Sequence, residues 1–305
     1  MMSDAPQHRL KIDPRAVSTF WKVCETGSIS GAARALNLSQ PSVSNTIALL
    51  EHRLGVTLFA RSRSGIVLTP EGLALRDRAE AMVRLLETAV VEVDHAARNI
   101  AGPLRIGGTP GALVSILPEA VARIEAQVGP FALSVVERPD PQLGDLLRKG
   151  TIDLACVTTE IEECPPDLAE ITVSRDPFAL VVGRRHDGLG GRVSLRDVAG
   201  LPWVLPEAQG AFRRQVDALF LAAGVPVPRN VIRCDSLLTT KAIVRHGDRV
   251  TILPRTVAAA ELTIGVLRAI AIEEATFERS VGIRYPVDRG LPPLGRAFVE
   301  ALSNP

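Results

Sequence analysis

The sequence predicts a mostly α-helical, winged helix-turn-helix region at the N-terminus, one long linker helix, and an α/β region in the rest of the chain. Three observations lead to this prediction. Two short apolar stripes of helical period flank residues 37–39, a broad apolar face runs from 70 to 98, and strand and helix patterns alternate beyond Gly102 and Pro103. A chain of 305 residues has room for two or three compact units, which agrees with this division.

Residues 11–69 form the predicted winged helix-turn-helix. A helix over 14–26 supplies an apolar packing platform, and two further short helices are expected within 28–54. The bend between them falls at Asn37, a residue type that tolerates the left-handed conformation, and Ser39 is a good N-cap for the second helix. The apolar stripes of these two helices comprise Ala32, Ala33 and Leu36, then Val43, Ile47, Leu50 and Leu54.

The opposite face of the second helix carries polar side chains that suit base recognition. Gln and Asn can each form a bidentate pair with adenine in the major groove, and Ser can bond to base edges or phosphates. Two short strands around a basic turn at 61–65 predict a wing, whose arginines would contact phosphates or the minor groove. The alternative is a surface helix whose polar residues only face water. The candidate DNA contacts are Ser39, Gln40, Pro41, Ser42, Ser44, Asn45, Arg61 and Arg63.

The formal net charge of +1 conceals an uneven distribution along the chain. Residues 1–70 carry a balance of +4, and the remaining residues a balance of −3. A basic N-terminal region followed by a slightly acidic remainder indicates that double-stranded DNA is the partner of the N-terminal region alone. Because +4 is weak for one DNA-binding monomer, a dimer, which doubles it, is the expected form.

Residues 70–98 form the predicted linker helix. Thr69 can cap it, and Pro70 suits its first position. Its apolar face continues through nearly thirty residues, more than a helix between two globular units can bury alone. The face therefore needs a packing partner outside the helix, the alternative being a helix folded onto its own domain.

The region from 103 to 305 alternates strand and helix patterns, which predicts a parallel sheet with helices on both faces. A first set of strands is expected at 104–107, 132–137 and 152–157, with helices at 112–127 and 142–149. A second set starts at 178–182. It continues with strands at 203–205, 230–234 and 250–253, helices at 212–223 and 237–246, and closes with a strand at 280–285 and a helix at 294–302.

The run from Leu36 to Gly72, LNLSQPSVSNTIALLEHRLGVTLFARSRSGIVLTPEG, closely resembles the DNA-binding domain of LysR-type transcriptional regulators. Weaker landmarks of the same family follow at 103–107, 117–118, 147–154 and 252–254. The chain departs from the family pattern at Asn45, Ser64 and Val67, where basic or polar residues are usual. Each departure removes a possible phosphate or base contact, so the target sequence or the salt dependence can differ from the family average.

The resemblance implies a C-terminal effector domain of the periplasmic-binding-protein type, with two lobes and a ligand cleft between them. Lobe 1 would comprise about 103–176 and 277–305, and lobe 2 about 177–276, with crossovers near Asp176 and Phe277. It also implies dimerisation through the linker helix, a tetramer made of two dimers, and a small-molecule effector whose binding alters the DNA-bound oligomer. The expected function is therefore that of a ligand-responsive transcriptional regulator.

The ends of the predicted strands indicate where an effector would bind, because α/β sheets bind ligands at the carboxyl ends of their strands. The turn at 107–111 opens a helix whose free N–H groups suit a carboxylate or another polar group, although a purely structural turn is the alternative. An aspartate facing the cleft would repel a carboxylate, which favours a polar or hydroxylated ligand. The candidate effector contacts are Thr109, Gly111, Asp140, Thr158, Pro206 and Ser236.

The sequence lacks the patterns of several enzyme classes: it has no P-loop, no GxSxG and no HExxH. No enzymatic activity, cofactor or metal is expected, because the four cysteines show no ligand spacing with one another or with histidine. No apolar run could span a bilayer and the N-terminal residues lack a signal core, so a cytoplasmic protein with no membrane partner is expected.

Two alternative functions remain open at this point. Cys156 and Cys164 could form a redox switch, although the peroxide-sensing member of the family has its cysteine pair in the second lobe. The α/β region could also be a solute-binding module that does not control DNA binding.

Overall fold

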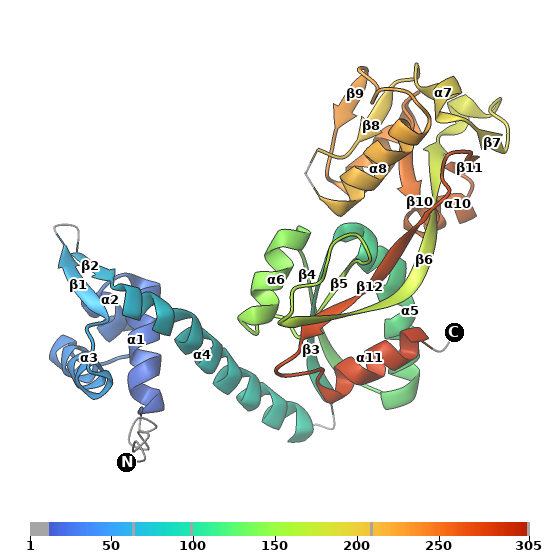
Figure 1. Cartoon of the computed structure of the whole chain (residues 1–305). Helices are drawn as coiled ribbons and strands as arrows, with labels where there is room; N and C mark the ends of the chain where they lie inside the picture. The colour runs from blue at the N-terminus through green and yellow to red at the C-terminus, as the bar shows by residue number, and fades with distance from the viewer. Residues whose placement is uncertain (1–11, 63–64, 98–99, 208–209, 304–305) are drawn as a thin grey trace, which may run out of the picture. The chain divides into compact units, whose positions relative to one another are not determined.

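The computed structural model describes residues 12–62, 65–97, 100–207 and 210–303 (Figure 1). Its internal contacts divide the chain into two compact units. The first is built on Met1–Ala97, and the second comprises Arg98–Arg148 and Ile152–Pro305. No helix in the described ranges is both long and apolar enough to cross a bilayer.

The first unit is a three-helix core with a β-hairpin. Helices α1 (Pro14–Thr26), α2 (Ile29–Ala35) and α3 (Gln40–Leu54) are followed by strands β1 (Phe59–Ser62) and β2 (Gly65–Leu68), which pair antiparallel. Asn37 adopts the left-handed conformation at the bend between α2 and α3, with φ 54°. The largest buried side chains of the core are Phe20, Leu50 and Leu58.

Helix caps and one carboxylate fix the joints of this unit. Ser28 and Ser39 cap α2 and α3 through their hydroxyl groups. Glu51 on α3 accepts hydrogen bonds from the backbone N–H groups of Leu58 at 2.7 Å and Phe59 at 3.2 Å, so it holds the link to the wing. Gly72 is required because a Cβ there would lie 2.1 Å from the carbonyl oxygen of Leu58.

Helix α4 (Pro70–Ala97) starts against the core and continues beyond it. Thr69 caps it by accepting from the Gly72 N–H at 3.0 Å, and Ala79 is fully buried. In its second half, however, large apolar side chains are exposed: Leu85 at 69%, Val90 at 71% and Val93 at 70%. The apolar face identified in the sequence thus has no described partner within the first unit.

The second unit is built on a mixed eight-stranded sheet, and each lobe has its own buried hydrophobic clusters. In lobe 1, β3 (Ala101–Gly108) pairs in parallel with β4 (Phe131–Glu137) and β5 (Leu154–Thr158). Helix α5 (Pro110–Val128) packs on this sheet together with α11 (Pro293–Ser303), and α6 (Asp140–Arg148) follows β4.

Lobe 2 contains the remaining short elements. Its strands are β7 (Arg192–Val193), β8 (Trp203–Leu205), β9 (Val231–Arg233), β10 (Thr251–Pro254) and β11 (Arg268–Ile272). Its helices are α7 (Leu195–Val198), α8 (Ala211–Ala222), α9 (Leu237–His246) and α10 (Ala259–Thr263), with 3-10 turns η1 (Arg184–His186) and η2 (Arg255–Ala258). The core of this lobe is centred on Trp203 and Phe220, which pack edge to face.

Two strands run between the lobes. The fifteen-residue strand β6 (Leu168–Val182) pairs with β12 (Glu278–Pro286) up to Pro177, and from Phe178 onward it pairs with β10 and β11. The switch of partners thus falls beside Asp176, and β12 brings the chain back from lobe 2 at Glu278. Figure 1 shows both strands passing from one lobe to the other.

The prediction of a parallel sheet was wrong for the middle strands of the sheet in the second unit. Strand β12 lies between β5 and β6 and is antiparallel to both. Its direction follows from its role as a returning crossover, which the strand and helix alternation does not encode. Strands β7 and β11 were also missed, because they are short or lie in a stretch without a clear apolar period.

Candidate nucleic-acid interface and ligand pocket

Helix α3 buries one face and exposes the other. Val43, Ile47 and Leu50 are buried in the core of the first unit. The candidate DNA contacts on this helix and its cap all lie on the solvent side, and they are Ser39, Gln40, Pro41, Ser42, Ser44 and Asn45. An exposed polar face at the N-terminal end of a second helix has the arrangement that a recognition helix needs to enter a major groove.

Two of these side chains have additional structural contacts. The hydroxyl of Ser39 accepts from the Ser42 N–H at 3.3 Å, so it caps the helix. The amide oxygen of Gln40 accepts a hydrogen bond from Ser30 on α2 at 3.2 Å. Ser30 is a positioning residue that sequence reasoning missed, because only the packing of α2 against α3 brings it to Gln40.

The wing is described only in part. Arg61 lies in β1, but its side chain is outside the described part of the structure, and Arg63 is outside the described residues altogether. The backbone pairing of β1 with β2 supports the predicted hairpin, with Arg61 opposite Ile66. The proposed phosphate contacts of both arginines therefore stay predictions.

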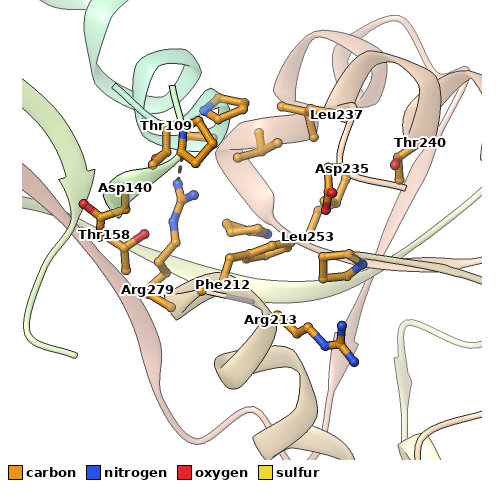
Figure 2. A pocket seen from close by; sticks show the side chains of 18 of the residues that line it. Thr109, Asp140, Thr158, Phe212, Arg213, Asp235, Leu237, Thr240, Leu253 and Arg279 are labelled. Atoms are coloured by element: carbon orange, nitrogen blue, oxygen red, sulfur yellow. Dashed lines mark hydrogen bonds between the residues drawn. The ribbon is translucent and has the colours of Figure 1, made fainter. Parts of the chain in front are cut away.

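In the second unit a cavity of about 330 Å³ lies between the two lobes (Figure 2). Five of the six candidate effector residues line it: Thr109, Gly111, Asp140 and Thr158 from lobe 1, and Pro206 from lobe 2. A pocket of this size, with mostly apolar walls and a few polar groups, is typical of small-molecule sites. The structure thus brings these residues to one place.

Ser236 does not line the cavity. Its hydroxyl accepts from the Thr239 N–H at 3.3 Å and caps α9, and its neighbours Asp235 and Leu237 face the cavity in its place. The sequence could not separate these two roles, because a Ser before a helix serves equally well as a cap and as a ligand contact.

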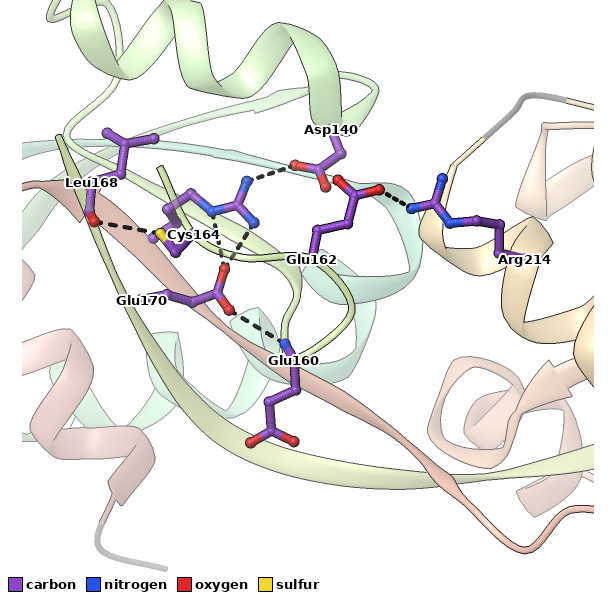
Figure 3. Close-up of polar contacts among 8 residues, drawn as sticks. Asp140, Glu160, Glu162, Cys164, Leu168, Glu170 and Arg214 are labelled. Atoms are coloured by element: carbon purple, nitrogen blue, oxygen red, sulfur yellow. Dashed lines mark hydrogen bonds and ion pairs between the residues drawn. The ribbon is translucent and has the colours of Figure 1, made fainter. Parts of the chain in front are cut away.

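Asp140 is not the isolated negative charge that the sequence suggested. Its carboxylate pairs with Arg284 at 3.1 Å, and Arg284 also pairs with Glu170 at 2.8 Å (Figure 3). Burial raises the pKa of the Asp140 carboxyl above its usual value, against the opposing effect of Arg284. The repulsion that it exerts on an anionic ligand is therefore smaller than its position alone implies.

The apolar wall of the cavity comes from residues that sequence reasoning did not select. Phe212, at the start of α8, faces the cavity and stacks on Phe178 with ring centroids 6.4 Å apart. Leu237, Leu253 and Val257 complete this side. No sequence signal distinguishes them from ordinary core residues, because they meet only when lobe 2 is folded.

A buried ion pair joins the two crossover strands, and one of its members, Arg279, lines the cavity. Asp176 on β6 and Arg279 on β12 are 3.4 Å apart and almost completely buried. Burial lowers the pKa of Arg279 to about 10, against the opposing effect of Asp176, so the guanidinium is still charged at neutral pH. Asp176 accepts hydrogen bonds from the N–H and the hydroxyl of Thr256, which connects the pair to lobe 2.

Further polar contacts between described residues of the two lobes lie outside the cavity. The hydroxyls of Ser115 on α5 and Thr256 on η2 are 3.0 Å apart. Arg214 on α8 forms an ion pair with Glu162 of lobe 1, as Figure 3 shows. These contacts hold the lobes in the arrangement that encloses the cavity, but they involve few groups, and the second is exposed and worth little energy.

Comparison with known proteins identifies the family. Residues 97–304 match the LysR substrate binding domain, and residues 14–73 match the bacterial regulatory helix-turn-helix protein of the lysR family. The chain belongs to the LysR family. This membership accounts for both units, because the two matches together cover almost the whole chain.

Individual LysR proteins show the same relationship. The HTH-type transcriptional regulator TfdS of Cupriavidus pinatubonensis is 30% identical over 292 residues, which cover 94% of this chain and 96% of TfdS. Full-length CbnR complexed with its target DNA is 23% identical, with a TM-score of 0.68 over 95% of this chain and 99% of CbnR. LysG of Corynebacterium glutamicum with bound effector Arg is 22% identical, with a TM-score of 0.61 over 95% and 98%. The two structures establish the shared fold.

Proposed function

We propose that this LysR-family protein is a ligand-responsive transcriptional regulator whose effector binds in the cavity between the two lobes. The cavity supports the proposal, because residues of both lobes line it. The two lobes are joined by β6 and by the β11–β12 connection. A ligand that contacts both walls stabilises one relative placement of the lobes over others. CbnR has been solved with its target DNA and LysG with an effector, which supports both halves of the proposal.

The DNA contacts are proposed for the N-terminal half of α3 and for the wing. The exposed side chains of Gln40, Ser44 and Asn45 would read base edges in the major groove, and Arg61 and Arg63 would contact the backbone. Ser39 would contribute as the cap that orients α3.

The exposed apolar residues of α4 support a dimer. Leu85, Leu86, Val90 and Val93 lie along the half of the helix that has no described packing partner in the first unit. A monomeric protein seldom exposes so many large apolar side chains on one helix, and a second copy of α4 would cover them. A dimer also presents two recognition helices to two half-sites, and association of two dimers would give the expected tetramer.

A redox switch at Cys156 and Cys164 is disfavoured. Cys156 is fully buried, and burial raises the pKa of its thiol to about 12. Burial also raises the pKa of Cys164, whose thiol donates to the Leu168 carbonyl. Both groups are therefore protonated at neutral pH, whereas a reactive cysteine needs a low pKa.

A ligand screen with a cavity variant tests the proposal. A metabolite that binds only the folded chain should raise its thermal unfolding midpoint. For such a compound, Thr109→Val should weaken binding by roughly 0.5–1.5 kcal/mol if the hydroxyl contacts the ligand. DNA affinity without the compound should be unchanged. A compound whose affinity is the same for the wild type, Thr109→Val and Phe212→Ala binds outside the cavity, and this result would contradict the proposal.

A further inference from the structure

The two lobes of the second unit carry opposite net charges. Residues 177–276 of lobe 2 contain thirteen Lys and Arg against nine Asp and Glu, a balance of +4. Residues 103–176 and 277–305 of lobe 1 contain ten against fifteen, a balance of −5. Twelve of the thirteen cations of lobe 2 are arginines. Where such charges gather on one surface, they attract a partner of opposite charge.

The strands of lobe 2 place three of these arginines at the end of the lobe opposite the cavity. β8 pairs in parallel with β9, and an isolated parallel bridge joins β8 to the start of β10. The segments that follow all three strands line the cavity, so the residues before the strands lie at the opposite end. Arg229 comes before β9 and Arg249 before β10. Arg268 begins β11 opposite Val182, the last residue of β6, at the same end.

A helix end and a turn bring three more arginines to this end. Helix α9 begins beside the cavity and ends away from it, with Arg245 in its last turn. Arg184 and Arg185 lie in η1, which follows β6. The turn packs on the end of α9, because a Cβ on Gly183 would lie 2.5 Å from the carbonyl oxygen of Val244. We call the six residues the arginine face: Arg184, Arg185, Arg229, Arg245, Arg249 and Arg268.

Carboxylates leave most of the charge of the arginine face uncompensated. Its four exposed members are Arg184, Arg185, Arg229 and Arg245. None of these four side chains forms an ion pair or a hydrogen bond with another described residue. The other two donate to neutral oxygens: Arg249 to the Trp203 carbonyl and Arg268 to the Asp187 carbonyl, both at 3.0 Å. The same segments contain two aspartates, Asp187 and Asp248, so the balance of the face is +4.

The composition of the arginine face fits a nucleic-acid backbone better than a protein surface. All six cations are arginines, and a planar guanidinium can bind two phosphate oxygens at once. The segments 183–189, 228–230, 245–249 and 266–269 expose no large apolar side chain. A protein interface normally buries apolar or aromatic side chains at its centre, whereas contacts to DNA phosphates need only charge and hydrogen-bond donors.

We infer that the arginine face of lobe 2 is a second DNA contact of this LysR-family protein, made to phosphates that flank the site read by α3. This inference goes beyond the proposed function, because it needs neither the cavity nor an effector. The balance of +4 on residues 1–70 is weak for one DNA-binding monomer, and the arginine face doubles it. Because lobe 1 offsets this charge within the second unit, the face adds to the contact made by α3 and does not hold DNA alone.

The test measures the DNA affinity of the full chain as a function of salt concentration. Two long duplexes are used, one with a site selected from random sequences and one without it. Arg184→Gln/Arg185→Gln/Arg245→Gln removes three charges that make no described side-chain contact, so the thermal unfolding midpoint should not change. The slope of log affinity against log salt should become shallower by about two to three, since each phosphate contact contributes about 0.9. Affinity should fall roughly tenfold on both duplexes, because phosphates carry no sequence information.

A matched variant controls for the loss of net charge. Arg175→Gln/Arg255→Gln/Arg296→Gln also removes three exposed arginines of the second unit, but none of them belongs to the arginine face or lines the cavity. A general electrostatic effect would weaken both triple variants equally. The inference predicts that the matched variant keeps nearly the slope and affinity of the wild type.

Three results would overturn the inference. The first is a wild-type salt slope in the arginine-face variant, and the second is an equal loss in the matched variant. The third is a loss confined to the duplex with the selected site, because a backbone contact acts on any sequence. If DNA binding is unchanged and the wild type instead binds poly-glutamate in a salt-dependent way that the arginine-face variant loses, the face belongs to an acidic protein partner and not to DNA.

Discussion

Gln40 combines exposure with a fixed orientation, which is what a side chain that reads bases needs. It lies in the first turn of α3, and its amide oxygen accepts from Ser30, so part of the entropy cost of orienting it is met before DNA binds. This hydrogen bond leaves the amide N–H₂ group available as a donor for a base edge.

Gln40→Ala should weaken binding to the cognate site by roughly 1–3 kcal/mol and relax the preference at one base pair. Ser30→Ala is the matched control, because it removes the hydrogen bond to Gln40 but no base contact. Its loss of affinity should be smaller than that of Gln40→Ala, and the variant should keep the base preference of the wild type. Fluorescence anisotropy on single-base variants of a selected site measures both. Equal losses on cognate and random DNA would show that Gln40 does not read bases.

Cys156 and Cys24 should be unreactive in the native protein. Because burial raises the pKa of Cys156 to about 12 and that of Cys24 to about 11, both thiols are protonated at pH values well above neutral. Iodoacetamide near pH 8 should leave Cys156 unmodified by mass spectrometry until the chain is unfolded, and peroxide should leave DNA affinity unchanged. Rapid alkylation of Cys156, or a peroxide-dependent change in DNA affinity, would restore the redox alternative.

At the scale of elements, sequence patterns predicted those parts of the fold that depend on local periodicity. The apolar stripe Val43, Ile47 and Leu50 predicted the position of α3, because the buried positions of a helix repeat every three or four residues. Asn37 predicted the position of the bend. Strand direction was not predictable, since β12 runs antiparallel only because the chain returns from lobe 2. Arg279 was not selected from the sequence, because the residues that it contacts, Gly111, Ser115 and Asp176, are far away along the chain.

The exposed apolar residues of α4 predict that a substitution on this helix changes the oligomeric state. Leu86→Asp places a charge among the exposed apolar residues of the helix, where a partner helix would bury it at a cost of several kcal/mol. The variant should sediment as a smaller species than the wild type in analytical ultracentrifugation and bind operator DNA more weakly. Leu86→Met, which conserves the apolar volume, should keep the oligomeric state of the wild type. An unchanged oligomer in the aspartate variant would mean that this face does not form the dimer.

At the scale of the whole molecule, the second unit has the properties of an independent domain. Each lobe has its own hydrophobic core, and the crossover strands β6 and β12 pair with each other and not with the first unit. The internal contacts place Arg98–Arg148 and Ile152–Pro305 in one unit, and the domain boundary at Gly102 and Pro103 stays a prediction.

A shortened chain of residues 100–305 should therefore fold alone and retain ligand binding. Its thermal unfolding should be cooperative, and any compound that stabilises the full chain through the cavity should stabilise the fragment with similar affinity. The fragment should not bind DNA, because it lacks α3 and the wing. A fragment that unfolds without cooperativity, or that loses the ligand, would show that the cavity depends on the first unit.

Occupation of the cavity in the second unit should change how the first unit binds DNA. Footprinting of the full chain on DNA selected from random sequences, with and without a cavity ligand, tests it most directly. The ligand should alter the length or pattern of the protected region in the wild type. Phe212→Ala should abolish this change at the same ligand concentration and leave the ligand-free footprint the same. A footprint that the bound ligand leaves unaltered, or that it alters equally in the Phe212→Ala variant, would contradict the claim.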